Sequence, residues 1–167
     1  MRHLIPVLVL PFNVLITIPT IILLSTGGIY SRWGNSWWEI CLFAFGIVFI
    51  ILGLSLIIRT ILLFHCVGKG TLAPWDPPKE FVATGVYLYT RNPMISGGLL
   101  ALLGEVLVFG SVYILIWWGI FFTAKTIYFI FHEEPEMEKR FGKKYLEYKN
   151  NVPRWIPRSS AWKSLER

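Results

Sequence analysis

Charged side chains are scarce in this chain: lysine, arginine, aspartate and glutamate together make up 16% of its 167 residues. Hydrophobic residues make up 54%, and the mean hydropathy is +0.56. A soluble domain of this length needs far more polar surface to face water. The composition therefore disfavours an ordinary soluble domain and favours a membrane protein.

Cysteine is also rare, and its two copies exclude a disulfide framework. Cys41 and Cys66 lie at opposite ends of an apolar stretch that we expect to be helical. At helical rise they would lie roughly 37 Å apart, too far to bridge within one chain. The sequence shows no metal-ligand spacing, P-loop or Ser/His/Asp set, so we expect no bound metal ion.

Long uncharged runs, by contrast, are abundant. Residues 4–26 and 40–58 contain no charged side chain, and residues 94–131 contain only Glu105 and Lys125. Each of the first two runs has the length that a hydrocarbon core of about 30 Å requires of one helix, and the third is about twice as long. Four membrane crossings follow.

The third run must fold back on itself, because one helix of about 38 residues would be far longer than a bilayer is thick. Gly110-Ser111 is the best candidate for the turn. We therefore predict an all-α fold, a multi-pass transmembrane helix bundle with about four membrane helices, the last two forming a C-terminal hairpin. A buried helix pair of a soluble protein is the alternative for this run.

Lysine and arginine predict the orientation of the bundle. With four crossings, both termini share one side with the central loop, and the opposite side offers only Arg32. The shared side holds Arg2, Lys69, Lys79, Arg91 and a basic tail. Because cytoplasmic loops carry the excess of positive charge, both termini are predicted to be cytoplasmic. The net charge of +6 favours attraction to anionic lipid headgroups over nucleic acid binding.

The chain divides into two parts of different character. Residues 1–64 read as a two-helix transmembrane scaffold, and residues 65–167 carry nearly all the polar patterning in a loop, the hairpin and the tail. The first run is too long for a cleaved signal peptide, contains Pro6, Pro11 and Pro19, and precedes no A-x-A-like cleavage site. We therefore expect it to be a retained membrane helix.

The segment Arg91-Asn92-Pro93 is predicted to start a helix. Proline is tolerated in the first turn, where the backbone amides are unpaired in any case. Arg91 and Asn92 then lie at a helix N-terminus, whose free amides and positive dipole end favour an anion. We expect a carboxylate or a phosphate to dock there.

A second polar segment follows the hairpin. Residues 133–150 are predicted to form one cytoplasmic amphipathic helix, because apolar residues at spacings of three and four form a single stripe. The stripe consists of Met137, Phe141, Tyr145, Tyr148 and Val152. This helix either lies on the inner leaflet or closes a pocket over the hairpin with its aromatic face.

Glu133 and Glu134 follow the apolar run directly, so at least one carboxylate lies near the membrane interface and needs a partner. Arg91 or Lys79 is available on the same face. The alternative is a pair of solvated juxtamembrane acids.

Glu105 and Lys125 are expected near opposite ends of the hairpin, too far apart to pair. Snorkelling accounts for Lys125 as well as a functional role does. Glu105 fits a hydrogen bond within the bundle.

The polar motifs together resemble a known family. The pattern G-V-Y-x-x-x-R-N-P-M, a membrane hairpin, and then E-E-x-x-M-x-x-x-F-G-x-x-Y-x-x-Y-x-x-x-V-P-R resembles the isoprenylcysteine carboxyl methyltransferase and phospholipid methyltransferase group of integral membrane enzymes. The stretch G-K-G-T-L-A-P-W-D-P-P-K is similar to the loop of the bacterial members. The resemblance covers residues 68–158.

The resemblance implies S-adenosylmethionine-dependent methyl transfer without a Rossmann domain, at the cytoplasmic face, to a lipid or lipid-like small molecule. It makes Glu133 a catalytic residue beside the cofactor and the acceptor. The chemistry of the residues suggests Arg91 as a second catalytic residue, which would hold the cofactor carboxylate together with the helix N-terminus. The cofactor site that the resemblance implies consists of Lys79, Glu80, Phe81, Val82, Tyr87, Arg91, Asn92, Pro93, Met94, Ile95, Glu133 and Glu134.

Three positions depart from the eukaryotic prenylcysteine enzymes. Asn92 stands where those enzymes have histidine, and Ile95 where they have tyrosine. Phe129 stands where they have the arginine near the acceptor carboxylate, which disfavours a prenylcysteine carboxylate as substrate. Amine, carboxylate and thiol acceptors all stay open.

Two other functional classes are alternatives. Membrane sterol reductases share a related C-terminal architecture and use a nicotinamide cofactor, although they are usually longer and have more crossings. A non-enzymatic scaffold or lipid-binding protein is the other alternative, for which Arg91, Glu133 and Glu134 would be incidental.

Overall fold

The computed structural model describes residues 11–27, 36–67, 81 and 83–163 of the chain. All regular structure in these residues is helical, which confirms the predicted all-α class. In chain order the helices are η1 (Asn13–Thr17), α2 (Ile18–Thr26), α3 (Trp37–Val67), η2 (Gly85–Leu88), α4 (Pro93–Phe109), α5 (Val112–Tyr128), η3 (Phe129–Glu133), α6 (Glu134–Phe141) and α7 (Lys143–Asn151).

Two helical stretches are long and apolar enough to cross a membrane, Trp37–Leu63 and Val112–Phe141. The stretches Asn13–Thr26 and Pro93–Phe109 are shorter apolar helices. The count of four crossings therefore stays a prediction. Side chains such as Phe45, Leu52 and Ile58 are exposed along α3, as a lipid-facing surface requires.

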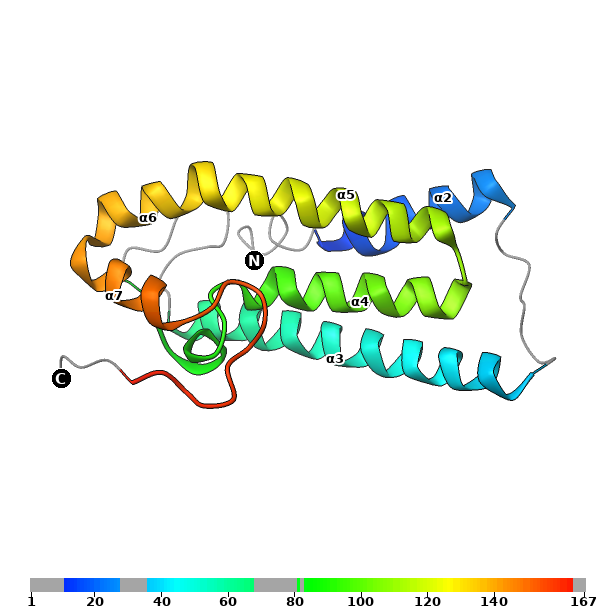
Figure 1. Cartoon of the computed structure of the whole chain (residues 1–167), viewed down its shortest axis with the longest axis horizontal. Coiled ribbons are helices and arrows are strands. Elements are labelled where there is room, and N and C mark those ends of the chain that lie inside the picture. The colour runs from blue at the N-terminus through cyan, green and yellow to red at the C-terminus, as the bar shows by residue number, and fades with distance from the viewer. Residues whose placement is uncertain (1–10, 28–35, 68–80, 82, 164–167) are drawn as a thin grey trace.

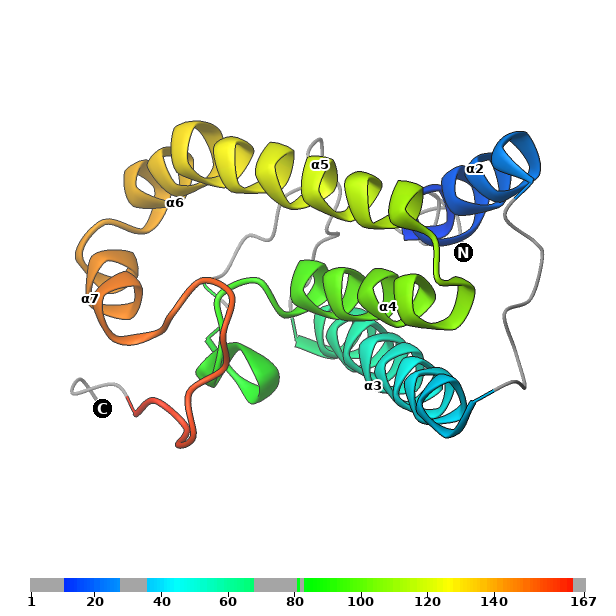
Figure 2. The same cartoon turned by 45° about the vertical axis from the view of Figure 1, so that its right-hand side comes forward.

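The helices form an elongated bundle whose polar parts lie at one end. α3 and α4 lie side by side, and α5 returns along α4 and continues through η3 into α6 (Figure 1). Turning the molecule shows α2 near the N-terminal part of α5. α7 and the C-terminal segment lie at the opposite end of the bundle (Figure 2). That end is where α3 finishes and α4 begins.

The α3–α4 interface is built on glycine. A Cβ placed on Gly53 would lie 2.5 Å from the Gly97 carbonyl oxygen, and one placed on Gly46 would lie 2.8 Å from that of Gly104. The two backbones therefore touch, as small residues allow between membrane helices. Gly46 faces Gly104 and Gly53 faces Gly97, so residue numbers rise along one helix as they fall along the other, and the two helices are antiparallel.

The predicted turn of the hairpin is confirmed. α4 ends at Phe109, and Gly110 follows with a φ of +59°, a left-handed conformation that glycine adopts without strain. Ser111 then caps α5, because its hydroxyl accepts from the amide of Ile114 at 3.4 Å. The turn thus uses one residue to end a helix and the next to begin another.

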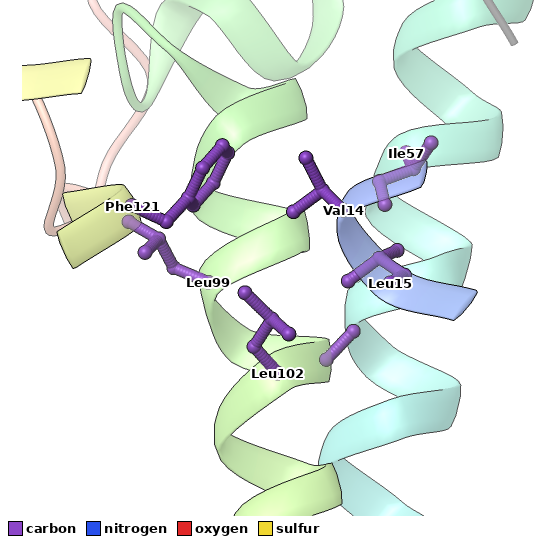
Figure 3. Packing of buried hydrophobic residues seen from close by; sticks show 7 residues of the cluster. Val14, Leu15, Ile57, Leu99, Leu102 and Phe121 are labelled. Carbon is purple, nitrogen blue, oxygen red and sulfur yellow. The ribbon is translucent and has the colours of Figure 1, made fainter. Parts of the chain in front are cut away.

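The core of the bundle joins four helices through apolar side chains. Val14 and Leu15 of η1, Ile57 of α3, Leu99 and Leu102 of α4 and Phe121 of α5 converge between the helices (Figure 3). Two indole nitrogens add hydrogen bonds to backbone carbonyls, from Trp117 to Val14 and from Trp118 to Leu99. The hairpin is therefore held at a defined depth against α3 and η1.

The prediction of one continuous tail helix is wrong. α6 ends at Phe141, and the chain turns at Gly142, whose φ of +55° and ψ of −130° no helix contains. α7 then continues in a new direction. Its residues Tyr145 and Tyr148 are buried together with Val152 and with Trp162 of the C-terminal segment. The aromatic stripe is therefore largely covered by the protein itself.

Candidate functional site

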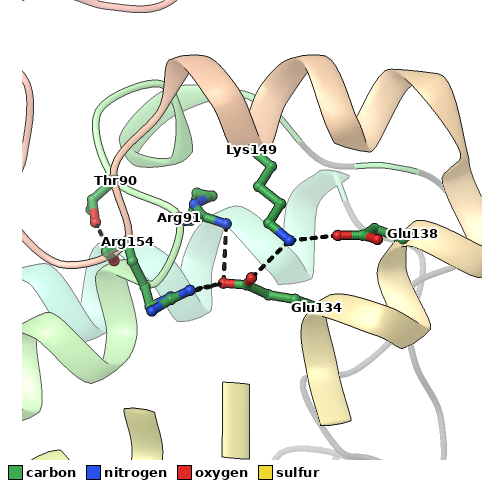
Figure 4. Close-up of polar contacts among 6 residues, drawn as sticks. All are labelled: Thr90, Arg91, Glu134, Glu138, Lys149 and Arg154. Atoms are coloured by element: carbon green, nitrogen blue, oxygen red, sulfur yellow. Dashed lines mark hydrogen bonds and ion pairs between the residues drawn. The ribbon is translucent and has the colours of Figure 1, made fainter. Parts of the chain in front are cut away.

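Two polar segments on either side of the hairpin meet at one end of the bundle. Arg91 lies just before α4, and Glu134 is the first residue of α6. Their side chains form an ion pair, with 3.1 Å between Arg91 Nη1 and Glu134 Oε1 (Figure 4). The expectation that Arg91 and a carboxylate pair across the hairpin is confirmed, and the carboxylate is that of Glu134.

Glu134 lies at the centre of a larger group of charges. Its Oε1 also accepts from Arg154, at 2.8 Å from Nε and 2.7 Å from Nη2, and Lys149 Nζ lies 3.1 Å from its Oε2. Lys149 pairs in turn with Glu138. The side chain of Glu134 is only 6% exposed, and a carboxylate buried to this degree requires such partners. These five residues are called the Glu134 cluster below.

The segment after α7 holds Arg91 through its backbone. The amide of Arg91 donates to the Pro153 carbonyl at 2.9 Å, and the hydroxyl of Thr90 donates to the Arg154 carbonyl at 3.0 Å. Arg154 therefore contacts the Arg91 region twice, through its own carbonyl and through the shared carboxylate of Glu134. A shift of the C-terminal segment would move Arg91.

Trp155 connects the same segment to the hairpin. Its carbonyl accepts from the hydroxyl of Ser96 at 3.1 Å, in the first turn of α4. Its ring centroid lies 5.6 Å from that of Phe122 and 5.6 Å from that of Phe129. Phe129 is buried, and the three rings form an apolar wall that adjoins the Glu134 cluster through the chain, since Trp155 directly follows Arg154.

The aromatic stripe of the tail reaches two of the predicted cofactor residues. The ring of Phe81 lies 5.4 Å from that of Phe141 and 5.2 Å from that of Tyr148, so Phe81 is part of the packing beneath α7. The hydroxyl of Tyr148 donates to the carbonyl of Tyr87 at 2.7 Å. Burial raises the pKa of the phenols of both Tyr87 and Tyr148 well above the usual value.

The other predicted residues before the hairpin lie together at the start of α4. Asn92 precedes the helix, and its side chain makes no capping hydrogen bond; Pro93 is the first helical residue, as predicted. Met94 and Ile95 line a small apolar pocket together with Phe121 of α5 and residues of η1 and α3. The polar cluster and the apolar recess therefore meet at the start of α4, since Arg91 directly precedes the helix and Met94 and Ile95 belong to its first turn.

Glu133 ends the π-helical segment η3, one residue before the Glu134 cluster, and is half-buried. Among the described residues, no cation lies within ion-pair distance of its carboxylate. Its charge acts on Tyr87 and Lys125 from a greater distance. Lys79, Glu80 and Val82, which the resemblance also implies, lie outside the described residues.

Three residues of the site were not predicted from the sequence: Lys149, Arg154 and Trp155. Arg154 was visible in the motif V-P-R, but nothing in the sequence names Glu134 as its partner. Lys149 lay among many basic residues of the tail, and its pairing depends on the turn at Gly142. No motif or periodic pattern in the sequence includes Trp155.

One family of known proteins matches this chain. The model of the phospholipid methyltransferase family matches residues 40–144, from the start of α3 to the start of α7. Neither a curated protein nor a solved structure matches. The match covers more than half of the chain and includes Arg91, Glu133 and Glu134, and the family points to methyl transfer in a membrane. The chain therefore belongs to the phospholipid methyltransferase family.

Proposed function

We propose that this protein transfers the methyl group of S-adenosylmethionine to a lipid or lipid-like acceptor at the cytoplasmic face of the membrane. The observation that carries the proposal is the meeting of Arg91 and Glu134 across an apolar hairpin, beside the apolar recess at Met94 and Ile95. A soluble cofactor and a membrane-borne acceptor need one site that both reach. The end of a membrane hairpin is such a place.

The chemistry of the residues fits this cofactor, which carries a carboxylate and an ammonium group. Arg91 Nε is buried and has no hydrogen-bond partner among the described residues, so the guanidinium keeps one donor for an anion. The amides of Met94 and Ile95 precede the first intrahelical bond of α4, which Ser96 donates to Asn92. Together they would hold the carboxylate, as helix N-termini do.

Glu133 complements that anion site. Since no cation pairs with it among the described residues, its carboxylate would take the cofactor ammonium or position a protonatable acceptor. Glu134, by contrast, already has three cationic partners and would act by positioning Arg91. We assign binding to Glu133 and Arg91, and support to Glu134.

When bound, S-adenosylmethionine supplies a methyl group that its sulfonium already activates toward a nucleophile. The protein then needs to exclude water and to align the reactants, an effect of up to about 7 to 11 kcal/mol in well-oriented cases. Phe122, Phe129 and Trp155 form a wall that excludes water beside Arg91. Their ring faces would also favour a cation at the site.

The proposed topology follows from the positive charges of the sequence. Four helices cross the membrane, and both termini lie with the Glu134 cluster in the cytoplasm, where Lys and Arg accumulate. Residues 1–64 serve as scaffold, and residues 65–167 form the site. Accessibility labelling of Ser36→Cys and Ser159→Cys, each in a chain whose native cysteines are replaced by serine, should place the two positions on opposite sides.

Binding and turnover test the proposed function. Calorimetry on the detergent-purified protein should detect binding of S-adenosylmethionine and none of NADPH. Incubation with labelled S-adenosylmethionine and total membrane lipids should then yield a labelled lipid, identified by mass analysis. Binding of NADPH instead would support a reductase, and binding of neither would support a scaffold.

Two substitutions test the site residues. Glu133→Gln and Arg91→Ala should each lower cofactor affinity or turnover by about tenfold or more, the effect of losing one charged hydrogen bond. Glu136→Gln is the matched control, because Glu136 is an exposed carboxylate of the same segment. Wild-type affinity and turnover in both site variants would overturn the assignment.

A further inference from the structure

Lys125 is the one positive charge between residues 94 and 131, and the proposed function leaves it without a role. Its ammonium has no carboxylate within ion-pair distance among the described residues. Glu105, the other charge of the hairpin, lies toward the opposite end of α4. A charge among apolar side chains of a membrane helix needs a partner.

The ammonium of Lys125 lies between two aromatic rings of the same helix. Nζ lies 6.0 Å from the ring centroid of Phe121, four residues toward the middle of the helix, and 5.4 Å from that of Tyr128. Ring faces stabilise a cation in part and do not use its N–H donors, so the ammonium keeps these donors for an anion.

These surroundings place Lys125 between two parts of the proposed site. Phe121 lines the apolar pocket together with Met94 and Ile95. In the other direction, Glu133 lies about two turns beyond Lys125 along the continuous helical stretch Val112–Phe141. Tyr128 is 39% exposed, so this neighbour of the ammonium lies at the surface of the bundle.

We propose that Lys125 binds an anionic group, a phosphate or a carboxylate, of the lipid acceptor and so holds its reactive atom beside Glu133. This inference rests on the proposed function, and it makes the acceptor an anionic or zwitterionic lipid. The lipid tail would extend into the bilayer along the apolar surface of α5. Lys125 is thus a substrate-binding residue that does not touch the cofactor.

Three variants of the full-length protein test the inference, with labelled S-adenosylmethionine as donor and total membrane lipids in mixed micelles as acceptor. Lys125→Met keeps the length of the side chain and removes its charge, Lys125→Arg keeps the charge, and Lys139→Met removes an exposed charge from α6. We expect Lys125→Met to raise the apparent KM for the lipids by about tenfold or more. Lys125→Arg should have an apparent KM close to that of wild type, and Lys139→Met should have the wild-type KM.

Calorimetric titration with S-adenosylmethionine separates this inference from the proposed function. If wild type does not bind the cofactor, the proposed function fails and this inference with it. If Lys125→Met binds the cofactor as wild type does and its lipid KM is also unchanged, the inference alone fails. Thermal unfolding of each variant accompanies these measurements. A rise in KM in Lys125→Met that also appears in Lys125→Arg counts against the inference as well.

Competition by amphiphiles identifies which anionic group Lys125 binds. Phosphatidic acid presents a phosphate, oleate presents a carboxylate, and diacylglycerol presents neither. Stronger inhibition of wild type by phosphatidic acid points to a phosphate, and stronger inhibition by oleate points to a carboxylate. Either preference should disappear in Lys125→Met, whereas equal inhibition by all three amphiphiles would contradict an anion site.

Discussion

The α3–α4 interface and the Glu134 cluster stabilise the same helix in different ways. Along α3, α4 is held by the absence of side chains, since Gly53 and Gly97 bring the two backbones into contact. At its N-terminal end, α4 is preceded by Arg91, which pairs with Glu134 of α6, and the same carboxylate also pairs with Lys149 of α7 and Arg154 of the C-terminal segment. One contact depends on shape and the other on charge.

The difference follows from the surroundings of each region. Lipid tails are as apolar as leucine, so close packing rather than burial of apolar surface joins α3 to α4. At the polar end, a carboxylate that is 6% exposed needs cations, and the chain supplies them from positions far apart in sequence. The stability of the polar end should therefore depend on individual charges, and that of the α3–α4 interface on the size of individual side chains.

The largest effect should come from breaking the charged region. Glu134→Gln leaves Arg91, Arg154 and Lys149 without their common anion, and breaking a buried ion pair on one side costs about 3 to 5 kcal/mol of the free energy of unfolding. Thermal unfolding in detergent measures the loss. Glu136→Gln, an exposed acid of the same helix, is the control, and an equal midpoint for both variants would show that the cluster carries no stability.

The next largest effect should come from filling the interface. Gly53→Val adds a side chain where a Cβ alone lies 2.5 Å from a backbone oxygen, so α3 and α4 must separate. Overpacking of this kind costs about 1 to 3 kcal/mol. Gly119→Val is the matched control, because a Cβ on Gly119 meets nothing within 4 Å. Comparable unfolding midpoints for the two valine variants would refute the packing argument.

The smallest effect concerns the buried phenols of Tyr87 and of Tyr148 in α7, and it depends on pH. Burial raises the pKa of Tyr87 and Tyr148, so the neutral form is favoured in the folded protein. The resulting stability is complete below the usual pKa of about 10 and decreases as pH rises above it. Tyr148→Phe should lose about 1 kcal/mol near pH 8, with its bond to the Tyr87 carbonyl, and should show a weaker decline above pH 10.

Unfolding midpoints of wild type and Tyr148→Phe between about pH 8 and 11 check this prediction. Tyr113→Phe, a change at an exposed tyrosine of α5, should decline as wild type does. Parallel curves for Tyr148→Phe and wild type would mean that burial of Tyr148 does not govern alkaline stability.

Several elements of the fold and site were predictable because their causes are local. The uncharged run from 94 to 131 was too long for one helix, and Gly110-Ser111 offered the turn that the structure has. Pro93 predicted the start of α4, since proline fits the first turn and little else in a helix. The pairing of Arg91 with an acid after the hairpin followed from bringing the two hairpin ends together.

Other elements were not predictable, because they depend on contacts between distant segments. The amphipathic stripe of the tail is as periodic across Gly142 as before it, so periodicity alone could not reveal the break between α6 and α7. Adjacent acids look alike in sequence, and only the return of α7 and the C-terminal segment distinguishes Glu134, with its cations, from Glu133. Trp155 became part of the site through the same return.

The sequence by itself determined the all-helical class, the hairpin and the family, because hydrophobic run length, turn residues and motif order are written along the chain. Tertiary structure alone decided which glycines touch, which acid collects the positive charges and where Lys125 finds its aromatic neighbours. The physical reason is range. Backbone preferences act over a few residues, whereas packing and ion pairing act over a few ångströms in space, between residues as far apart as Arg91 and Arg154.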